Sequence, residues 1–557
     1  MATDFLWQES IRDGVAEKSA RPGPKDATEE INGKTIMMEN NSGDLTLNAD
    51  YVEQPQTVFD MVTGPFDNTM LLESAEIDSK LGTRSLLLTN SALRISCLGG
   101  TVFSQALTPN GMNANDQLYS LLKDTLQCSL AGNQLTVEYP DIDQDLDEDT
   151  RLRSRTVLDF LRTALQKLKC HQGRSRKLLG GCFSYDLISS FEKLPNVAVS
   201  PNDCPDYCFY LAETCIHIDH INQTTRILGA TFEGSRNDRP RIESRLQELA
   251  RICNLSDRAY NPDPEKISAR IMTDLSDDEY GKMVDDLKEY IRKGDIFQVV
   301  PSRTFAIPCP SPKAAFRQLK AANPSPYMFY LNDESFTIFG ASPESSVKYS
   351  AETNLVEMYP IAGTSARGKN AEGKIDADLD GRMELAMRND QKEVAEHLML
   401  VDLARNDIAR ISQSGTRYVK DLLKVDRYSH VMHLVSRVVG QLRADLDALH
   451  AYQACMNMGT LTGAPKIRAT ELIRTHERKR RGSYGGAIGY LSGNGDMDTC
   501  IVIRSAFVKN GTAYVQAGAG VVYDSVPARE AQETRNKAAA VLNAIATAHG
   551  AVLKELQ

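Results

Sequence analysis

The chain has 557 residues, of which 41% are hydrophobic and 25% are charged, and its formal net charge is −10. These values are typical of a globular protein of roughly three or four domains. The net negative charge argues against a nucleic-acid partner. No run of about 18 apolar residues occurs, so no membrane span is expected.

Cysteine usage and the amino terminus indicate the compartment. The eleven cysteines are scattered, with no Cys-x-x-Cys pair and no accompanying His pattern, which argues against a zinc site. The amino terminus, MATDFLWQESIRDG, contains acidic residues and has no apolar core, unlike a secretory signal. We therefore expect a cytoplasmic protein with reduced thiols.

Composition divides the chain into three parts. Residues 1–50 are polar and have little apolar periodicity, which predicts a flexible extension. The proline-containing stretch NPDPEK, 261–266, marks the main boundary. The prediction is therefore an amino-terminal part over 51–262 and a second part over 263–557.

The amino-terminal part reads as mixed strands and helices. Segments 69–77 and 84–99 predict short strands joined by turns, and 156–168 is an amphipathic helix. Segment 177–194 predicts a buried strand that runs into a helix. Strand 209–220 should pair with 224–232, and 241–254 is a helix.

The second part follows a similar pattern. Segment 277–296 predicts a helix, 296–307 a strand, 311–324 a helix with a Ser cap, 327–342 a hairpin and 447–457 a helix. Segment 485–523 predicts an antiparallel meander with a turn at Asn510-Gly511, and Pro527 begins a last helix. The basic run HERKRRG, 476–482, reads as a solvated helix end.

Two predicted helices each carry a pair of glutamates. The stretch from Gln391 to Arg410 has helical periodicity and carries Glu393 and Glu396, and the Pro527 helix carries Glu530 and Glu533. Residues three apart lie on neighbouring turns of one face, so two such pairs could hold Mg²⁺, which prefers oxygen ligands. Such pairs are also common on solvated surfaces, and spacing alone leaves both interpretations open.

Several residues in the meander could bind an anion. Arg504 is predicted in the middle strand on an apolar face, where it needs either a carboxylate ligand or an internal ion-pair partner. Gly518-Ala519-Gly520 follows the next strand and could present backbone N–H groups to an anion, or form a bulge. Tyr484, flanked by glycine, suggests an exposed ring near tight backbone.

Three further segments could take part in chemistry. IAGTSARG, 361–368, predicts a loop in which Thr364 and Arg367 could contact an anion. Glu344 follows a proline at a strand end, where burial would make it a general acid and where a first helical turn is the alternative. His397 has the usual ambiguity between a catalyst and a satisfied core residue.

Many short segments, in order, resemble one family. The chain resembles component I of anthranilate synthases, within the chorismate-utilising enzymes, from about residue 55 to its end. The segments that carry the resemblance are PYMFYL, FGASPES, YPIAGT, EHLMLVDLARND, DRYSHVMHLVS, MGTLTGAPK, RGSYGG, DTCIVIRSA, VQAGAG and ETRNK.

The resemblance implies a fold and a set of roles. The fold would be α+β, with antiparallel sheets packed against peripheral helices. Glu396 and Glu533 would bind Mg²⁺ directly, and Glu393 and Glu530 would hold metal-bound water. Chorismate would be bound by Gly363, Thr364, Tyr484, Arg504, Gly518, Ala519 and Gly520. Glu344 would protonate the departing C4 hydroxyl, and His397, with Thr460 nearby, would assist pyruvate elimination.

Two positions indicate the nucleophile. The related aminodeoxychorismate synthases carry a nucleophilic lysine where this chain has Ala362. Water-using relatives place a lysine base where this chain has Gln298, which cannot act as that base. The resemblance therefore favours ammonia that adds without a covalent enzyme intermediate.

Regulation and partners are also implied. The segment LLESAEIDSK, 71–80, matches the family's tryptophan-binding segment, with Ser74 as the main contact and Pro326, Tyr327 and Met328 completing the pocket; Glu73 and Lys80 are weaker candidates. A separate glutamine amidotransferase chain, component II, would supply ammonia, in a heterotetramer of two large and two small subunits.

The leading prediction is a tryptophan-inhibited, Mg²⁺-dependent anthranilate synthase large subunit, a lyase that forms anthranilate and pyruvate in tryptophan biosynthesis. One alternative is a synthase that stops at 2-amino-2-desoxyisochorismate. Another is a catalytically inactive tryptophan-binding subunit. Ser365 and Ala366 replace an Arg-Pro pair that is usual in the family, so turnover or loop closure could differ.

Overall fold

A computed structural model describes residues 45–64, 66–75, 82–234, 238–255, 266–267, 270–370, 372–427 and 431–553, and the backbone of two short strands at 30–31 and 34–35. The side chain of Thr364 lies outside this description. So do Lys80 and most of the predicted extension and of the 261–266 boundary.

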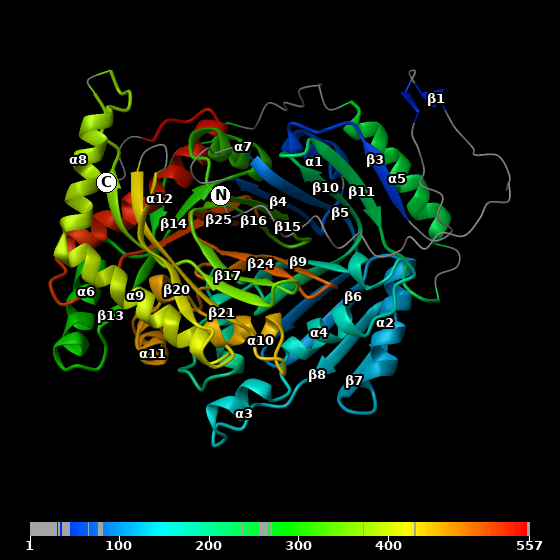
Figure 1. The fold of residues 1–557 in the computed structure, drawn as a ribbon, viewed down its shortest axis with the longest axis horizontal. Helices are drawn as coiled ribbons and strands as arrows, with labels where there is room; N and C mark the ends of the chain where they lie inside the picture. The colour runs from blue at the N-terminus through cyan, green and yellow to red at the C-terminus, as the bar shows by residue number, and fades with distance from the viewer. Residues whose placement is uncertain are drawn as a thin grey trace.

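The centre of the molecule is an antiparallel system of strands. Strand β10, Tyr207–Asp219, pairs along one edge with β5, Gly82–Leu98, and along the other with β9, Leu178–Phe183, and then β11, Thr224–Gly229. From this junction two series of strands spread through the protein (Figure 1). Antiparallel sheets with helices outside them confirm the α+β prediction.

The first series contains strands from both predicted parts. It runs β3 (Thr46–Ala49), β11, β10, β5, β4 (Thr69–Ala75), β15 (Tyr327–Asn332), β16 (Thr337–Ser342), β25 (Ser505–Lys509), β26 (Thr512–Gly518), β14 (Ser302–Pro308) and β12 (Met272–Thr273). β5 also continues into β6 (Thr101–Ala106), β8 (Gln134–Glu138) and β7 (Gln127–Ala131).

The second series passes from β9 into the carboxyl-terminal half. It runs β23 (Ala487–Ser492), β24 (Met497–Ile501), β17 (Ser345–Ser350), β18 (Leu355–Met358), β21 (Val431–Gln441) and then β20 (Tyr418–Arg427), with β19 (Ile361–Ala366) also on β21. A small ladder joins β13 (Gln298–Val299) to β22 (Gly463–Ala464). Strand pairing thus crosses the predicted boundary at 262/263, which stays a prediction.

Helices cover the outside of both series. Those of the first half are α1 (Pro55–Val62), α2 (Pro109–Leu122), α3 (Glu148–Arg153), α4 (Leu158–Gln166) and α5 (Arg239–Cys253). Those of the second are α6 (Asp277–Arg292), α7 (Pro312–Ala322), α8 (Ala377–Asn389), α9 (Gln391–Ala409), α10 (Ala448–Cys455), α11 (Lys466–Glu477) and α12 (Pro527–Ala548). Helices α8 and α9 form one side of the view in Figure 1.

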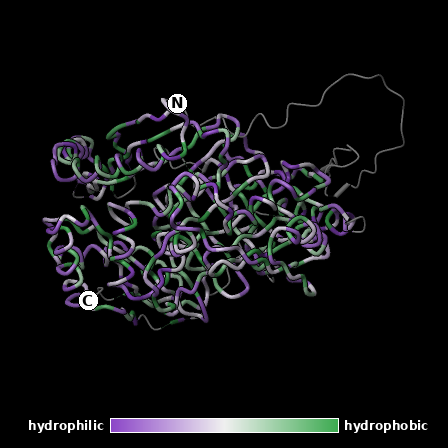
Figure 2. Tube along the Cα trace, turned by 90° about the horizontal axis from the view of Figure 1, so that it is seen from below, coloured by the Kyte–Doolittle hydropathy of each residue, from purple (hydrophilic) through white to green (hydrophobic). Residues whose placement is uncertain are grey.

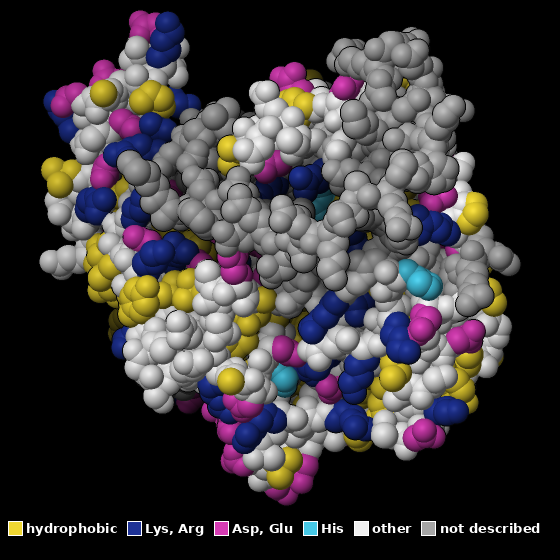
Figure 3. All heavy atoms as spheres, turned by 45° about the vertical axis from the view of Figure 1, so that its right-hand side comes forward, with side chains coloured by type: hydrophobic (Ala, Val, Ile, Leu, Met, Phe, Trp, Pro, Cys, Tyr) yellow, Lys and Arg dark blue, Asp and Glu magenta, His cyan; other side chains and the backbone are white. Residues whose placement is uncertain are grey.

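Apolar residues gather between these layers. Buried side chains such as Leu87, Phe316 and Ile545 join β5, α7 and α12 in one core, and the hydropathy colouring of Figure 2 shows hydrophobic segments mixed through the interior. Basic and acidic side chains are interspersed over the described part of the face drawn in Figure 3. No helix among the described residues is long and apolar enough to span a membrane.

The structure corrects several local predictions. The short strand predicted at 84–99 is one long strand, β5, which ends at Leu98, and its neighbouring residues Leu87 and Leu88 are buried in different cores. Ser311 precedes α7 without a side-chain cap bond. IAGTSARG forms strand β19 over most of its length rather than a loop. The predicted extension ends before Leu45, since Leu45 is buried and β3 pairs with β11.

The basic run after α11 is solvated only in part. Arg481 is 1% exposed and pairs with Glu477, while the half-buried Arg480 and Lys479 pair with Asp206 and Asp274. The prediction of a solvated helix end was therefore wrong for Arg481, whereas Arg478 is exposed.

Candidate active site

Glu344 lies in the short gap between β16 and β17. Its backbone carbonyl accepts from Ile501 N at 3.0 Å, which fixes it against β24. Its side chain is buried, and Thr460 Oγ1 donates to Glu344 Oε1 at 3.0 Å. Glu344 is therefore not in a first helical turn, and Thr460, which was predicted to lie near His397, is in direct contact with Glu344.

The environment of Glu344 favours its neutral form. Burial raises the pKa of the Glu344 carboxyl to about 8, against smaller opposing effects from the Thr460 hydrogen bond and from Lys537 and Arg504. A desolvated carboxyl of this kind keeps its proton at neutral pH and can donate it to a substrate oxygen. The geometry and electrostatics suit a general acid.

Arg504 lies where β24 has ended and β25 has not begun. Its φ of +50° is unusual for a residue with a side chain, and its carbonyl accepts from Ala341 N at 3.1 Å. The prediction that Arg504 lies within the middle strand of the meander was therefore wrong, because the chain kinks at Arg504 between β24 and β25. Burial lowers the pKa of Arg504, while Tyr484, Glu533 and Glu344, which surround it, favour the charged form.

Tyr484 is buried rather than exposed as predicted, and it lies against the Gly518 segment. A Cβ on Gly518 would lie 3.2 Å from Tyr484 Oη and 2.6 Å from the carbonyl oxygen of Pro301. Burial raises the pKa of the Tyr484 hydroxyl to about 12, so it remains a hydrogen-bond donor at neutral pH. The lack of a side chain at Gly518 is what allows this close approach.

Not all of the backbone N–H groups at 518–520 are available to an anion. Ala519 N donates to Pro301 O at 3.2 Å and to Tyr280 Oη at 3.3 Å, so this N–H is engaged within the protein. Lys537 Nζ donates to Gly518 O at 2.9 Å and pairs with Glu533 at 2.7 Å. Lys537, which our sequence analysis did not single out, places a cation between this segment and α12.

Helices α9 and α12 bring Glu396 and Glu530 within electrostatic reach of each other. The Asp390 carboxylate caps α9 by accepting from Lys392 N and Glu393 N, and Pro527 begins α12. Burial raises the pKa of Glu396 and Lys392 opposes this, while Glu393 and Glu530 raise it further; burial and Glu533 likewise raise the pKa of Glu530. Glu396 and Glu530 therefore interact electrostatically across the two helices.

Magnesium binding by these carboxylates stays a prediction, since Glu396 pairs with Lys392 and Glu533 with Lys537. Among the described residues, no group of three or more His, Cys, Asp or Glu side chains is arranged to hold a metal ion. Mg²⁺ needs no such cage, because it commonly takes one or two carboxylates with substrate oxygens and water. Mutually repelling, part-buried carboxylates are stabilised by a cation.

The strand β19 and α9 position two more predicted residues. Gly363, at φ +83°, forms a bulge in β19, and a Cβ there would lie 3.5 Å from Glu393 Oε2. His397 is fully buried, with Nε2 2.7 Å from Ser436 Oγ and Nδ1 3.2 Å from Ala362 O. Arg367 pairs with Asp380, so this side chain is held by α8 rather than by an external anion.

Gln298 reaches the same region from β13. A Cβ on Gly520 would lie 2.8 Å from Gln298 Nε2, and Gln298 Oε1 is buried with no hydrogen-bond partner among the described residues. An acceptor left without a donor in a buried site suits a ligand that carries N–H groups.

The residues predicted to bind tryptophan lie beside one another in the β4–β15 ladder, and a binding pocket among them stays a prediction. Ser74 in β4 is the register partner of Tyr327 in β15, and Ala75 N donates to Pro326 O at 3.0 Å. Ser74 Oγ also lies 2.7 Å from Thr83 Oγ1, and Met328 is buried. The weaker candidate Glu73 is paired with Lys320.

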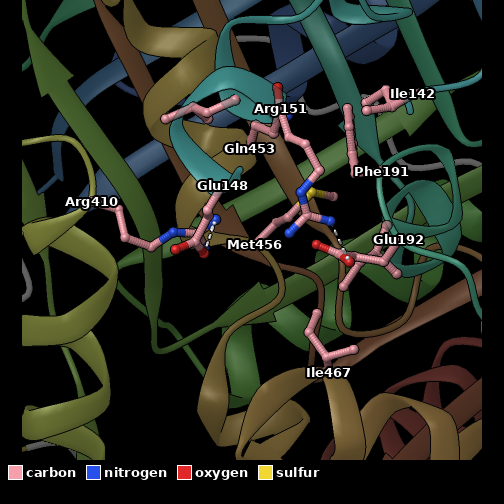
Figure 4. A pocket seen from close by; sticks show the side chains of 11 residues that line it. Ile142, Glu148, Arg151, Phe191, Glu192, Arg410, Gln453, Met456 and Ile467 are labelled. Carbon is pink, nitrogen blue, oxygen red and sulfur yellow. Dashed lines mark hydrogen bonds and ion pairs between the residues drawn. The ribbon is translucent and has the colours of Figure 1, made fainter. Parts of the chain in front are cut away.

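A separate pocket of about 40 Å³ lies beside α3, α10 and α11 (Figure 4). The ion pairs Arg151–Glu192 and Arg410–Glu148 cross it, and Met456 forms part of its wall. None of the predicted site residues lines this pocket, so it is distinct from the region around Glu344.

Comparison with known proteins identifies the family. The sequence profile of the family described as chorismate binding enzyme matches residues 124–543. The chain is 55% identical to "Anthranilate synthase component 1" of Vibrio cholerae over 501 residues, covering 90% of this chain and 95% of that protein. The Escherichia coli protein of the same name is 55% identical over 515 residues, covering 91% and 97%.

The chain belongs to the anthranilate synthase component 1 branch of the chorismate-binding enzymes. Among solved structures, component I of Streptococcus pneumoniae matches with a TM-score of 0.63 and 30% identity over 83% of this chain and 92% of that one. The isochorismate synthase MenF of Escherichia coli, at 16% identity and a TM-score of 0.60 over 90% and 94% of the two chains, shares the fold alone.

Proposed function

We propose that this chain is the large subunit of an anthranilate synthase, which converts chorismate and ammonia to anthranilate and pyruvate. The observation that carries the proposal is the buried Glu344 carboxyl, which burial keeps protonated beside Arg504 and Thr460. A proton donor next to a buried cation suits a reaction in which an anionic substrate loses a hydroxyl group.

The residues divide the chemistry between them. Arg504, Tyr484 and Lys537 bind and orient the two carboxylates of chorismate, since two cations and a phenol suit a dianion. Ammonia adds at C2 while the ring double bond shifts and the C4–O bond breaks, and Glu344 gives its proton to the departing oxygen, which leaves as water. Mg²⁺, held by Glu396 and Glu533 with Glu393 and Glu530 on its water, would supply Lewis-acid polarisation of the ring carboxylate.

The residues at two positions, 362 and 298, favour ammonia as the nucleophile. Ala362 offers no side-chain nucleophile, and the unpartnered Gln298 Oε1 can accept an N–H but cannot deprotonate water. A component 2 chain that hydrolyses glutamine would supply the ammonia, as the names of the relatives imply a second component.

Tryptophan would act through the first series of strands. Ser74 pairs with Tyr327, and Tyr327 pairs with Ser342, two residues before Glu344. A ligand that wedges β4 from β15 would therefore shift the strand end that carries the general acid. This supports feedback inhibition by L-tryptophan as a coupling between two adjacent sites.

A synthase that stops at 2-amino-2-desoxyisochorismate is the second candidate. Both ring nitrogens of His397 are within hydrogen-bond distance of protein oxygens, at Ser436 and Ala362, and burial lowers its pKa. A histidine held in this way is less available to remove the C2 proton in pyruvate elimination. This observation favours the second candidate over complete loss of chemistry.

One assay separates these functions. Purified chain is mixed with chorismate, ammonium and Mg²⁺, and anthranilate fluorescence and pyruvate are followed together. Both products support the proposal, an aminated product without pyruvate supports the second candidate, and no turnover contradicts both. Glu396→Gln and Glu533→Gln should each lower turnover by about 100-fold, as loss of a metal ligand or its support typically does; unchanged turnover would refute the metal assignment.

A further inference from the structure

A buried ion pair lies behind three segments that carry predicted site residues, namely the Thr460 turn, Tyr484 and the Gly518–Gly520 segment. Arg481 and Glu477 are each about 1% exposed at their side chains, and they meet through Arg481 Nη2 and Glu477 Oε1 at 2.5 Å and through Nε and Oε2 at 3.0 Å. An ion pair that is removed from water is costly to bury even when two hydrogen bonds join its partners. Stability alone therefore does not explain why this pair is present.

Arg481 reaches two of the three segments itself. Its Nη1 donates to Leu461 O at 2.7 Å, one residue after Thr460, and its Nη2 donates to Val300 O at 2.6 Å. Its guanidinium lies 5.7 Å from the ring centroid of Tyr484 and 4.7 Å from that of Tyr185. The rigid, planar fork of arginine can serve all these directions at once, which a lysine ammonium cannot.

Glu477 reaches the third segment. Its Oε1 accepts from both the backbone N–H and the hydroxyl of Ser302, each at 2.8 Å. Ser302 is the register partner of Gly518 in the β14–β26 ladder, so this carboxylate fixes the strand beside the Gly518–Gly520 segment. The pair thus connects the Thr460 turn, Tyr484 and Gly518 through one set of charge-assisted hydrogen bonds.

We propose that the Arg481–Glu477 pair is the positioning element of the chorismate site, which sets the Thr460 turn, the Tyr484 ring and the Gly518 segment relative to one another. This proposal rests on the proposed function, because it is measured by the turnover of chorismate. Neither residue needs to touch the substrate; both act through residues that do. Displacement of reacting groups by about 1 Å costs up to about 100-fold in rate, so small losses of fit here should be measurable.

Arg481→Lys tests the proposal because it keeps the charge and removes the fork. We expect kcat to fall about 10- to 100-fold and the KM for chorismate to rise about 10-fold, because proton donor and binding groups move together. Arg94→Lys is the control, since Arg94, whose side chain is 13% exposed, forms a two-bond pair with the buried Asp333 that contacts none of the three segments. It should cost comparable stability and leave kcat and KM unchanged.

Double-mutant cycles distinguish positioning from general destabilisation. If Arg481 acts through Thr460 and Tyr484, then Arg481→Lys should cost much less in a Thr460→Ala or Tyr484→Phe background than in the wild type. If Arg481→Lys is insoluble, Tyr185→Leu serves as the second variant. It removes the ring beneath the Arg481 guanidinium, leaves the hydrogen bonds of Arg481, and should shift kcat and KM in the same directions.

The outcomes are separable from those of the proposed function. A wild-type chain that makes neither anthranilate nor an aminated product refutes the proposed function. An active wild type whose Arg481→Lys variant matches Arg94→Lys in both constants, or whose double mutants are strictly additive, overturns the positioning role.

Discussion

At the scale of single residues, the site depends on how burial changes the chemistry of ordinary side chains. Glu344, Arg504 and Tyr484 are common residue types, and each is moved from its usual behaviour by desolvation and by its neighbours. An exposed Glu344 would be ionised and unable to donate a proton at neutral pH. The functional prediction at this scale is therefore a prediction about protonation.

The rate should fall as pH rises through the pKa of Glu344. The acid must be protonated to act, so kcat should decline above about pH 8, the pKa that burial gives this carboxyl. Arg504, Lys537 and Thr460 face Glu344 and each lowers its pKa. Thr460→Ala removes one of these effects and should move the alkaline limb to higher pH, measured with ammonium held at constant free-ammonia concentration. A limb that stays in place would contradict the assignment.

Glu344→Gln should lose activity and gain stability. Turnover should fall about 100- to 10,000-fold because a proton donor is removed. The folded-state pKa of Glu344 is raised, so its stabilising effect is complete below the unfolded value near 4.5 and is lost as pH rises toward 8. Between pH 5.5 and 7.5 the wild type should lose about 2.5 kcal/mol that the Gln variant keeps. Denaturant titrations at both pH values, with Thr460→Ser as control, measure this difference.

At the scale of elements, β9 is the strand on which the assembly most depends. It pairs with β10 on one edge and β23 on the other, so it joins the two series of strands. Its residue Gly181 allows this packing, because a Cβ there would lie 2.2 Å from Cys208 O and 2.6 Å from Phe209 Cα. The backbone of the neighbouring strand β10 leaves no room for a side chain.

Gly181→Ala and Gly381→Ala should have opposite effects on stability. The first forces backbone apart in a buried strand and should cost about 3 kcal/mol or more. The second adds a methyl group in exposed α8, where nothing lies within 4 Å, and should stabilise by about 1 kcal/mol. Thermal unfolding of the two variants checks the pair, and a Gly181→Ala protein as stable as the wild type would show that β9 tolerates strand displacement.

At the scale of the whole molecule, the predicted regulatory and catalytic regions share strands. Ser74 and Tyr327 are neighbours in one ladder, and β16, the strand after β15, ends two residues before Glu344. A regulatory ligand at Ser74 therefore needs no long-range domain movement to reach the chemistry.

Ser74→Phe should abolish inhibition by tryptophan and leave ammonium-driven kcat within about twofold of the wild type, because Ser74 touches none of the proposed catalytic groups. In the wild type, tryptophan and chorismate should weaken each other's binding by the same factor, as linkage requires. Calorimetric titration of each ligand with and without the other tests this reciprocity, and Thr83→Val, which removes the hydroxyl facing Ser74, is a neighbouring control. Unchanged inhibition of Ser74→Phe would place the pocket elsewhere.

The sequence by itself predicted the elements whose signals are local. Helix α9 was expected from its apolar spacing, α12 from Pro527, and the meander from Asn510-Gly511. The set of candidate site residues was expected from motifs that resemble one family. These features depend on periodicity, turn preferences and residue type, which need no knowledge of distant partners.

Only the tertiary structure decided which side chains are buried and with whom. The run HERKRR has the composition of a solvated helix end, yet Arg481 is buried because Glu477, Leu461 O and Val300 O lie around it. Arg504 lies at a kink in the chain and not in the strand that the sequence predicted. Tyr484, which was expected to be exposed, is buried against Gly518. Burial and long-range pairing are set by segments that meet only when the chain folds, so no local pattern contains them.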